Sequence, residues 1–163
     1  MLMLLLCLEI IPAHAEIGST TGQCISRYGQ PERDNMKGSG LLYFRKDGIC
    51  TIAHFYQGKC DVLSIFSSEG QMGVPDDLPK DRIQSLLKSE GGSPEWILPP
   101  RYSLNGVWCT PDRSTFAIYD TMRHKLAIMT HDAYMREQKS LAAVRSGNIK
   151  ASNPTKPTNP TKP

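Results

Sequence analysis

The sequence lacks most of the short motifs that mark enzymes and metal sites. It contains no C-x-x-C pair, which zinc ribbons and thioredoxin-like proteins use, and no G-x-S-x-G turn around a nucleophilic serine. A phosphate-binding loop is also missing, because residues 74–77 separate Gly70 and Gly73 from the next expected helix, and two aspartates there would repel an anion. We therefore predict no catalytic residue, no cofactor and no metal site.

The charge of the chain is too evenly balanced for a nucleic-acid-binding protein. Of its 19 Lys and Arg residues, Lys150, Lys156 and Lys162 lie in the C-terminal tail, and of its 16 Asp and Glu residues Glu9 lies in an N-terminal apolar run. The remainder has 16 basic and 15 acidic residues. Because binding of a phosphate backbone needs a concentrated positive surface, we expect no nucleic-acid partner.

Although no apolar run is long enough to cross a bilayer, the N-terminus has the pattern of an export signal. Residues 2–11 are apolar except for Glu9, and Ala13-His14-Ala15 is a small-x-small cleavage sequence. We predict a signal peptide over residues 1–15, cut between Ala15 and Glu16. The protein would then be periplasmic or extracellular, with no transmembrane segment in its mature form. The alternative is a buried N-terminal helix or strand.

Capping and turn residues predict the local structure of the first half. Thr20 and Gln23 fit a capping box, and Gly29 followed by Pro31 ends the first helix. The dipeptide Asp47-Gly48 lies between two apolar runs and favours a tight hairpin. We therefore expect a helix followed by a meander of strands.

The second half has a clearer helix and another set of strands. Asp76 or Asp77 is expected to cap this helix, and Ile83, Leu86 and Leu87 form its buried side. Branched and aromatic residues predict the strands of the whole chain: 41–45, 49–56, 60–66, 96–98, 107–109 joined with 116–119, and 125–130, with turns at 57–59 and 105–106.

This order of elements predicts an α+β fold. It would be a two-layer sandwich of an antiparallel sheet with helices on one face, and its halves indicate a tandem α-β-β-β repeat. The domain would cover residues 16–132, with a further helix over 133–146. Residues 147–163 are rich in Pro, Thr and Lys and carry almost no apolar side chains, which predicts a disordered tail.

Four cysteines remain after cleavage, and an exported protein can pair them. The expected turn places Cys60 opposite Tyr56, so that Cys50 lies six residues, about 20 Å, away from it along the strand. A disulfide needs Cα atoms within about 7 Å, which excludes Cys50–Cys60. The remaining connectivities are Cys24–Cys50 with Cys60–Cys109, and Cys24–Cys60 with Cys50–Cys109. The alternative is four buried free thiols.

The first half carries a series of residues found in a known group of envelope domains. They are Thr20-x-x-Gln23-Cys24-Ile25-Ser26-Arg27-Tyr28-Gly29-Gln30-Pro31, Tyr43, Asp47-Gly48 and Phe55-Tyr56-Gln57-Gly58-Lys59. In this pattern the chain resembles the SmpA/OmlA-type domains of outer-membrane assembly lipoproteins, which share their fold with the β-lactamase inhibitor proteins. The resemblance implies that fold and an exported, binding type of protein, and it brings no catalytic residue with it.

Two classes of function follow from these observations. A two-layer sandwich leaves one sheet face uncovered, and aromatic residues on the strands would make it a binding surface for an envelope or secreted protein. The same aromatic residues could instead serve only to pack the core. We therefore expect a non-enzymatic binding module, and the alternative is a small secreted hydrolase that uses His54 or Cys109.

Overall fold

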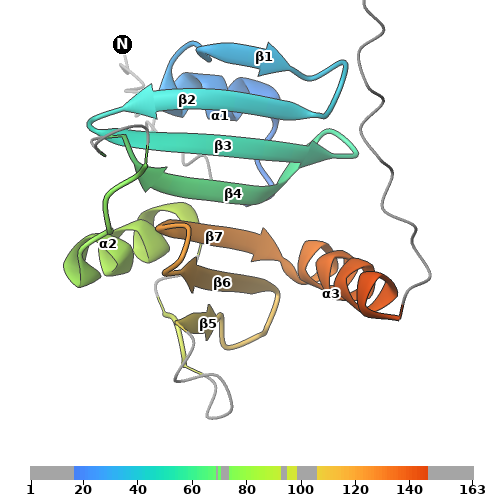
Figure 1. The fold of residues 1–163 in the computed structure, drawn as a ribbon. Coiled ribbons are helices and arrows are strands. Elements are labelled where there is room, and N and C mark those ends of the chain that lie inside the picture. The colour runs from blue at the N-terminus through green and yellow to red at the C-terminus, as the bar shows by residue number, and fades with distance from the viewer. Residues whose placement is uncertain (1–16, 69, 71–73, 93–94, 99–105, 147–163) are drawn as a thin grey trace, which may run out of the picture.

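The computed structural model describes residues 17–68, 70, 74–92, 95–98 and 106–146. Over these residues the chain forms three helices and one antiparallel sheet of seven strands (Figure 1). In chain order the elements are α1 (Thr21–Tyr28), β1 (Arg33–Asn35), β2 (Leu41–Lys46), β3 (Ile49–Tyr56), β4 (Lys59–Ser67), α2 (Lys80–Glu90), β5 (Val107–Cys109), β6 (Thr115–Asp120), β7 (Lys125–Thr130) and α3 (His131–Arg145). The α+β class predicted from the sequence is confirmed.

The sheet is made of two topologically equivalent halves. Its strand order is β1-β2-β3-β4-β7-β6-β5, so β2 to β4 form one meander and β5 to β7 form another. Each meander follows a helix, and the last strands of the two meanders, β4 and β7, pair antiparallel at the centre. Two α-β-β-β units thus meet through equivalent strands, and β1 is added at one edge.

The main core lies between the sheet and the first two helices. Successive side chains of a strand point to opposite faces, and on β2, β3 and most of β4 every second one is buried. On β7 four consecutive residues are buried, because both of its faces are covered. Leu42, Leu63 and Ile128 are completely buried on this face and pack with Cys24 of α1 and Leu86 of α2. We call this side of the sheet the covered face.

The third helix packs against the other side of the sheet. Ala133 at the start of α3 is buried against Ala127 and Met129, which alternate with the core residues of β7. Tyr134 stacks on Phe116 of β6 with ring centroids 4.7 Å apart. The first turn of α3 therefore covers β6 and β7. On the same side of the sheet, no described helix lies over β2, β3 and β4 (Figure 1). We call this part of the sheet the open face.

A β-bulge interrupts the hairpin between β3 and β4. His54 pairs with Val62 and Phe55 pairs with Cys60, which leaves Asp61 as the extra residue of β4. The bulge puts two consecutive side chains, Asp61 and Val62, on one side, so that Cys60 and Leu63 can both point into the core. This single irregularity positions residues on both faces of the sheet.

Several local expectations are corrected by the structure. The turn between β3 and β4 has two residues, because Tyr56 pairs with Lys59, and Cys60 therefore lies opposite Phe55 rather than Tyr56. The residues expected to form a strand over 96–98 make only the bridge between Ile97 and Cys109. The segments 107–109 and 116–119 belong to two separate strands, and β1 was not expected at all, because its residues are polar and exposed.

The caps of the first two helices differ in how well the sequence predicts them. Thr20 and Gln23 of α1 form both hydrogen bonds of the predicted capping box. The cap of α2 expected at Asp76 or Asp77 is wrong, because its N-cap is Pro79, which offers no side-chain acceptor. Asp77 is engaged elsewhere: it accepts hydrogen bonds from Tyr119 and contacts His124.

The two ends of the chain lie outside the described residues. The signal peptide expected over 1–15 with its cleavage at Ala15 and Glu16, the tail expected over 147–163, and Asn105 of the second expected turn belong to this part. The helix expected over 133–146 corresponds to α3. Within the described residues, no helix combines the length and the apolar character needed to cross a membrane.

Candidate functional site

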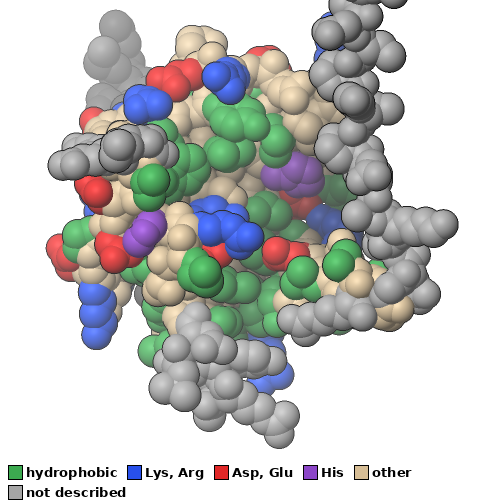
Figure 2. All heavy atoms as spheres, in the orientation of Figure 1, with side chains coloured by type: hydrophobic (Ala, Val, Ile, Leu, Met, Phe, Trp, Pro, Cys, Tyr) green, Lys and Arg blue, Asp and Glu red, His purple; other side chains and the backbone are tan. Residues whose placement is uncertain are grey.

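The open face of β2 to β4 presents apolar side chains, and no other element among the described residues covers those nearest β1. Val62 on β4 packs at its edge against the cluster of Ala127, Met129 and Ala133. Tyr43, Ile52, Val62 and Phe66 alternate with the buried residues of the three strands and are partly exposed. Tyr43 and Ile52 lie directly opposite each other across the β2–β3 pair, which brings their side chains together. In the view of Figure 2, hydrophobic side chains appear at the surface over these strands, interspersed with polar ones. The result is a continuous surface of mixed character.

This face is hollowed near the β1 edge. One depression of about 280 Å³ is lined by Tyr43, Arg45, Cys50 and Phe66 among others, and a neighbouring one of about 250 Å³ shares the last three of these residues. Arg45 stands at the rim, where it forms an exposed ion pair with Glu32 at 3.1 Å. An apolar floor with charged groups at its rim has the composition of a protein-binding surface.

A charged cluster closes the other end of the open face. Asp61, the bulged residue, is buried, and its Oδ1 lies 2.7 Å from His54 Nδ1. The guanidinium of Arg136 from α3 donates to the second oxygen of Asp61 and lies over the ring of Tyr56, 4.2 Å from its centroid. Both carboxylate oxygens are thus used, and the cluster fastens α3 to the β3–β4 hairpin.

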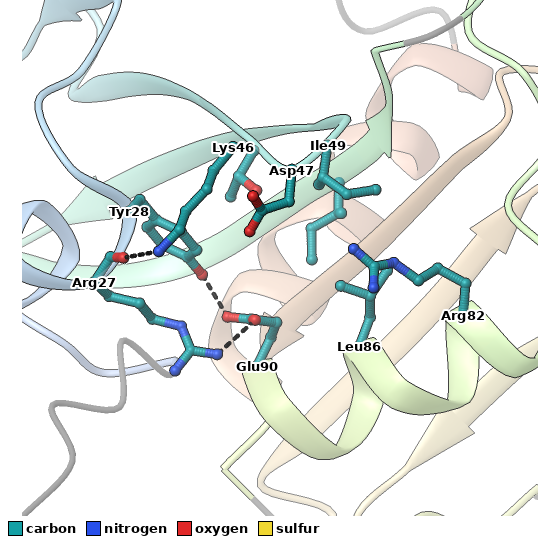
Figure 3. A pocket seen from close by; sticks show the side chains of 10 residues that line it. Arg27, Tyr28, Lys46, Asp47, Ile49, Arg82, Leu86 and Glu90 are labelled. Atoms are coloured by element: carbon teal, nitrogen blue, oxygen red, sulfur yellow. Dashed lines mark hydrogen bonds and ion pairs between the residues drawn. The ribbon is translucent and has the colours of Figure 1, made fainter.

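The opposite side of the molecule has a polar cavity between α1, α2 and the β2–β3 turn. It measures about 250 Å³, and Figure 3 shows Glu90 at its centre with Arg27 and Tyr28 directed toward it. Arg27 Nη2 donates to Glu90 Oε1 at 2.7 Å, and the hydroxyl of Tyr28 donates to Oε2. Ser89 adds a third donor at 2.9 Å. Because Glu90 is held by three donors, this carboxylate joins the two helices and is not free to act on a ligand.

The surroundings of Tyr28 in this cavity also shift its ionisation. Burial of the ring, followed by the negative charge of Glu90, raises the pKa of Tyr28 far above its usual range. A phenol that stays protonated remains a donor to Glu90 at every physiological pH. The contact between α1 and α2 is accordingly a fixed part of the fold.

His54 and Cys109, each of which could serve the alternative hydrolase, lie far apart in the sheet. His54 lies on β3 and Cys109 on β5, four strand positions apart in the sheet, or about 19 Å at the usual strand spacing. Cys109 is only 2% exposed. His54 does have an oriented carboxylate partner in Asp61, as a general base requires, but Asp61 is shared with Arg136.

The other two histidines of the described region, His124 and His131, lie at opposite ends of β7. His124 contacts Asp77 through Nδ1 at 2.6 Å, and His131 starts α3 with its ring near Phe116. Within the described residues, no three His, Cys, Asp or Glu side chains are grouped so that they could hold a metal ion.

The four cysteines of the expected mature chain lie on different faces of the sheet and differ in burial. Cys24 and Cys60 are buried in the same core on the covered face. Cys50 is partly exposed at the floor of the open-face hollow, opposite Phe66 and five residues along β3 from Phe55. Cys60 is thus about 17 Å from Cys50 along the strand direction, which is also too far for a disulfide.

Sequence reasoning missed the two buried carboxylates, Asp61 and Glu90. Both are paired with an arginine distant in sequence, Arg136 in one case and Arg27 in the other. One signal was present: if β4 alternated strictly from Leu63, Asp61 would point into the core. That conflict is itself the mark of a bulge.

No protein-family model matches the sequence, and no curated protein matches it. Among solved structures, the chain is similar to a cysteine-rich secretory protein from Staphylococcus aureus, with a TM-score of 0.39 and 8% identity. That alignment covers 72% of this chain and 45% of the other, so the chain spans less than half of the length of that protein. A likeness at this level says nothing of an activity or a partner.

Proposed function

We propose that the protein is an exported, non-enzymatic module that binds an envelope or secreted protein on its open face. The observation that carries this proposal is the apolar surface formed by Tyr43, Ile52 and Phe66, which are partly exposed and lie outside both hydrophobic cores. Burial of such side chains drives association between proteins, and aromatic residues contribute most of the binding energy.

The shape and charge of this face favour a protein partner over a small ligand. The hollows are shallow and share their floor at Cys50 and Phe66, whereas sites for small molecules enclose most of their ligand. Arg45 and Glu32 at the rim supply charges of both signs. The resemblance of the first half to SmpA/OmlA-type domains and the N-terminal export pattern support an envelope or secreted partner.

Site-specific photo-crosslinking in an exporting host tests this proposal. A photoreactive phenylalanine derivative at Tyr43 is expected to give one adduct of discrete mass, because the ring would lie inside the interface. The matched control carries the same group at Met122, which is 90% exposed at the β6–β7 turn. A second change, Ile52→Lys, should abolish the adduct without altering the thermal midpoint. Adducts of equal yield at both positions, or none at Tyr43, would contradict the proposal.

The hydrolase remains a second candidate because of one observation, the 2.7 Å contact that orients the ring of His54 on Asp61. Such a pair could serve as a general base for a bound substrate. Reagents that label activated serine or cysteine distinguish the two candidates. Stoichiometric labelling of one residue that disappears in His54→Ala would favour the hydrolase.

A further inference from the structure

Two cysteines from different parts of the chain meet in the core of the covered face. Cys24 lies on the first turns of α1 and Cys60 near the start of β4, and they are 1% and 0% exposed. Both are free thiols in the structure and belong to the same buried cluster, where each influences the ionisation of the other. No other pair among Cys24, Cys50, Cys60 and Cys109 is placed in this way, because the remaining two lie on separate strands of the opposite face.

Backbone hydrogen bonds hold this arrangement. The amide of Cys60 donates to the carbonyl of Ser19 at 2.8 Å, and the amide of Gly18 donates to the carbonyl of Cys60 at 2.7 Å. The segment before α1 is therefore fixed beside β4. Thr20 then caps α1, and Cys24, one helical turn further on, donates its amide to the Thr20 carbonyl at 3.0 Å. The helix thus begins directly over Cys60.

The bulge at Asp61 is a second requirement for this contact. Leu63 points into the core, so in a regular strand the residue three positions earlier would point to the open face. The extra residue reverses this alternation and turns Cys60 toward α1. Two independent features, the bulge and the pairing of Ser19 with Cys60, therefore bring the two thiols together.

We propose that Cys24 and Cys60 form a disulfide in the exported protein and that Cys50 and Cys109 remain thiols. The alternative pairings fail on geometry. Cys50 and Cys109 lie four strand positions apart, about 19 Å, and Cys60 and Cys109 lie three apart, about 14 Å. Cys50 points away from α1, so it cannot reach Cys24. The inference rests on export but not on the proposed binding face.

The chemistry needs a disulfide as oxidant, such as glutathione disulfide or a disulfide-donating oxidoreductase. Both thiols are buried in the folded protein, so the exchange with the oxidant takes place as the chain folds, and either thiolate, for example that of Cys24, can attack first. Its sulfur attacks the oxidant's disulfide and releases one thiolate. Cys60 then loses its proton and displaces the second. Two protein thiols are oxidised, and one glutathione disulfide is reduced to two glutathione molecules.

A non-reducing tryptic map tests the pairing directly. Trypsin places the four cysteines of the mature chain on four separate peptides: 16–27, 47–59, 60–80 and 102–113. In protein recovered from an oxidising compartment, we expect peptide 16–27 to be linked to peptide 60–80, with the other two alkylated. Any other linked pair, or four alkylated peptides, would overturn the proposal.

A refolding experiment separates this inference from the question of export. Reduced protein spanning residues 16–163 is refolded with glutathione disulfide, and its free thiols are titrated in denaturant. We expect two free thiols in the wild type, three in Cys24→Ser and one in the matched control Cys50→Ser. Four thiols in the wild type would overturn the disulfide even if the open face binds a partner. If the linked pair forms here but the protein of the cell is found reduced in the cytoplasm, the error lies in export instead.

Discussion

The two faces of the sheet are built from the same strands but differ in how deeply their side chains are buried. On the covered face Leu42, Leu63 and Ile128 are completely buried under α1 and α2, whereas Tyr43 and Ile52 on the open face remain partly exposed. Alternation along the strands supplies apolar residues to both sides. What distinguishes the faces is the presence of a helix above them, so one side stabilises the fold and the other is left available.

Each face also has one buried carboxylate that fastens a helix through an arginine. Glu90 joins α2 to Arg27 of α1 on the covered face, and Asp61 joins β4 to Arg136 of α3 on the other. The surroundings differ, because the side chain of Arg27 is 21% exposed and that of Arg136 is 41% exposed. Water should therefore weaken the second pair more than the first.

The two faces should differ most in how much free energy of unfolding is lost when an apolar side chain is shortened to alanine. Leu63→Ala should lower the free energy of unfolding by about 3 kcal/mol, because it opens a cavity in a completely buried site. Ile52→Ala on the neighbouring strand should cost about 1 kcal/mol or less, since its side chain is already partly in water. Urea denaturation of the two variants measures both values. Equal losses would mean that the open face is part of the core.

The second comparison removes the charge from each carboxylate. Glu90→Gln should cost about 2 kcal/mol, because Arg27 is left partly buried without its counter-ion. Asp61→Asn should cost about 1 kcal/mol, with faster amide hydrogen exchange confined to α3, because Arg136 can be hydrated where it stands. Thermal denaturation and hydrogen exchange of the two variants provide the measurements. Global loss of protection in Asp61→Asn would show that α3 belongs to the main cooperative unit.

The smallest effect concerns pH and tests how completely the ring of Tyr28 is buried on the covered face. The pKa of Tyr28 is raised by burial and by Glu90, so above pH 10 the unfolded chain loses this proton more readily than the folded one. Stability from Tyr28 is complete below about pH 10 and falls as the pH rises beyond it, by about 1.4 kcal/mol per pH unit. Tyr28→Phe removes this dependence, and chemical denaturation at pH 9, 10 and 11 compares the two proteins. Parallel curves would mean that water reaches the phenol.

Local signals in the sequence predicted the elements whose cause is local. The capping box at Thr20 and the Asp47-Gly48 turn concern residues close in sequence, and both have the predicted form. Strand β7 follows from its own apolar residues and has the predicted bounds. In each case neighbouring residues contain all the information that the element needs.

Elements that depend on distant contacts were predicted poorly. Asp77 has the chemistry of an N-cap, but Tyr119 and His124, more than 40 residues away, bind it instead. Strand β1 consists of Arg33, Asp34 and Asn35, whose side chains give no strand signal, and it forms only because β2 is there to pair with it. The pairing of Asp61 with Arg136 could not be predicted either, because the two residues are 75 positions apart in the sequence.

The edges of the sheet determine whether a second copy of the chain could extend it by strand addition. At one edge β1 has three polar, fully exposed residues, and at the other β5 has three residues whose last, Cys109, already exchanges two backbone hydrogen bonds with Ile97 at 2.9 and 3.0 Å. Short, charged or occupied edges offer little to a strand from another copy. Fibre-like growth by strand addition is therefore disfavoured at both edges. Under the proposed function, a partner would instead recognise side chains on the face itself, so selectivity would depend on their shape and not on the hydrogen bonds of the backbone.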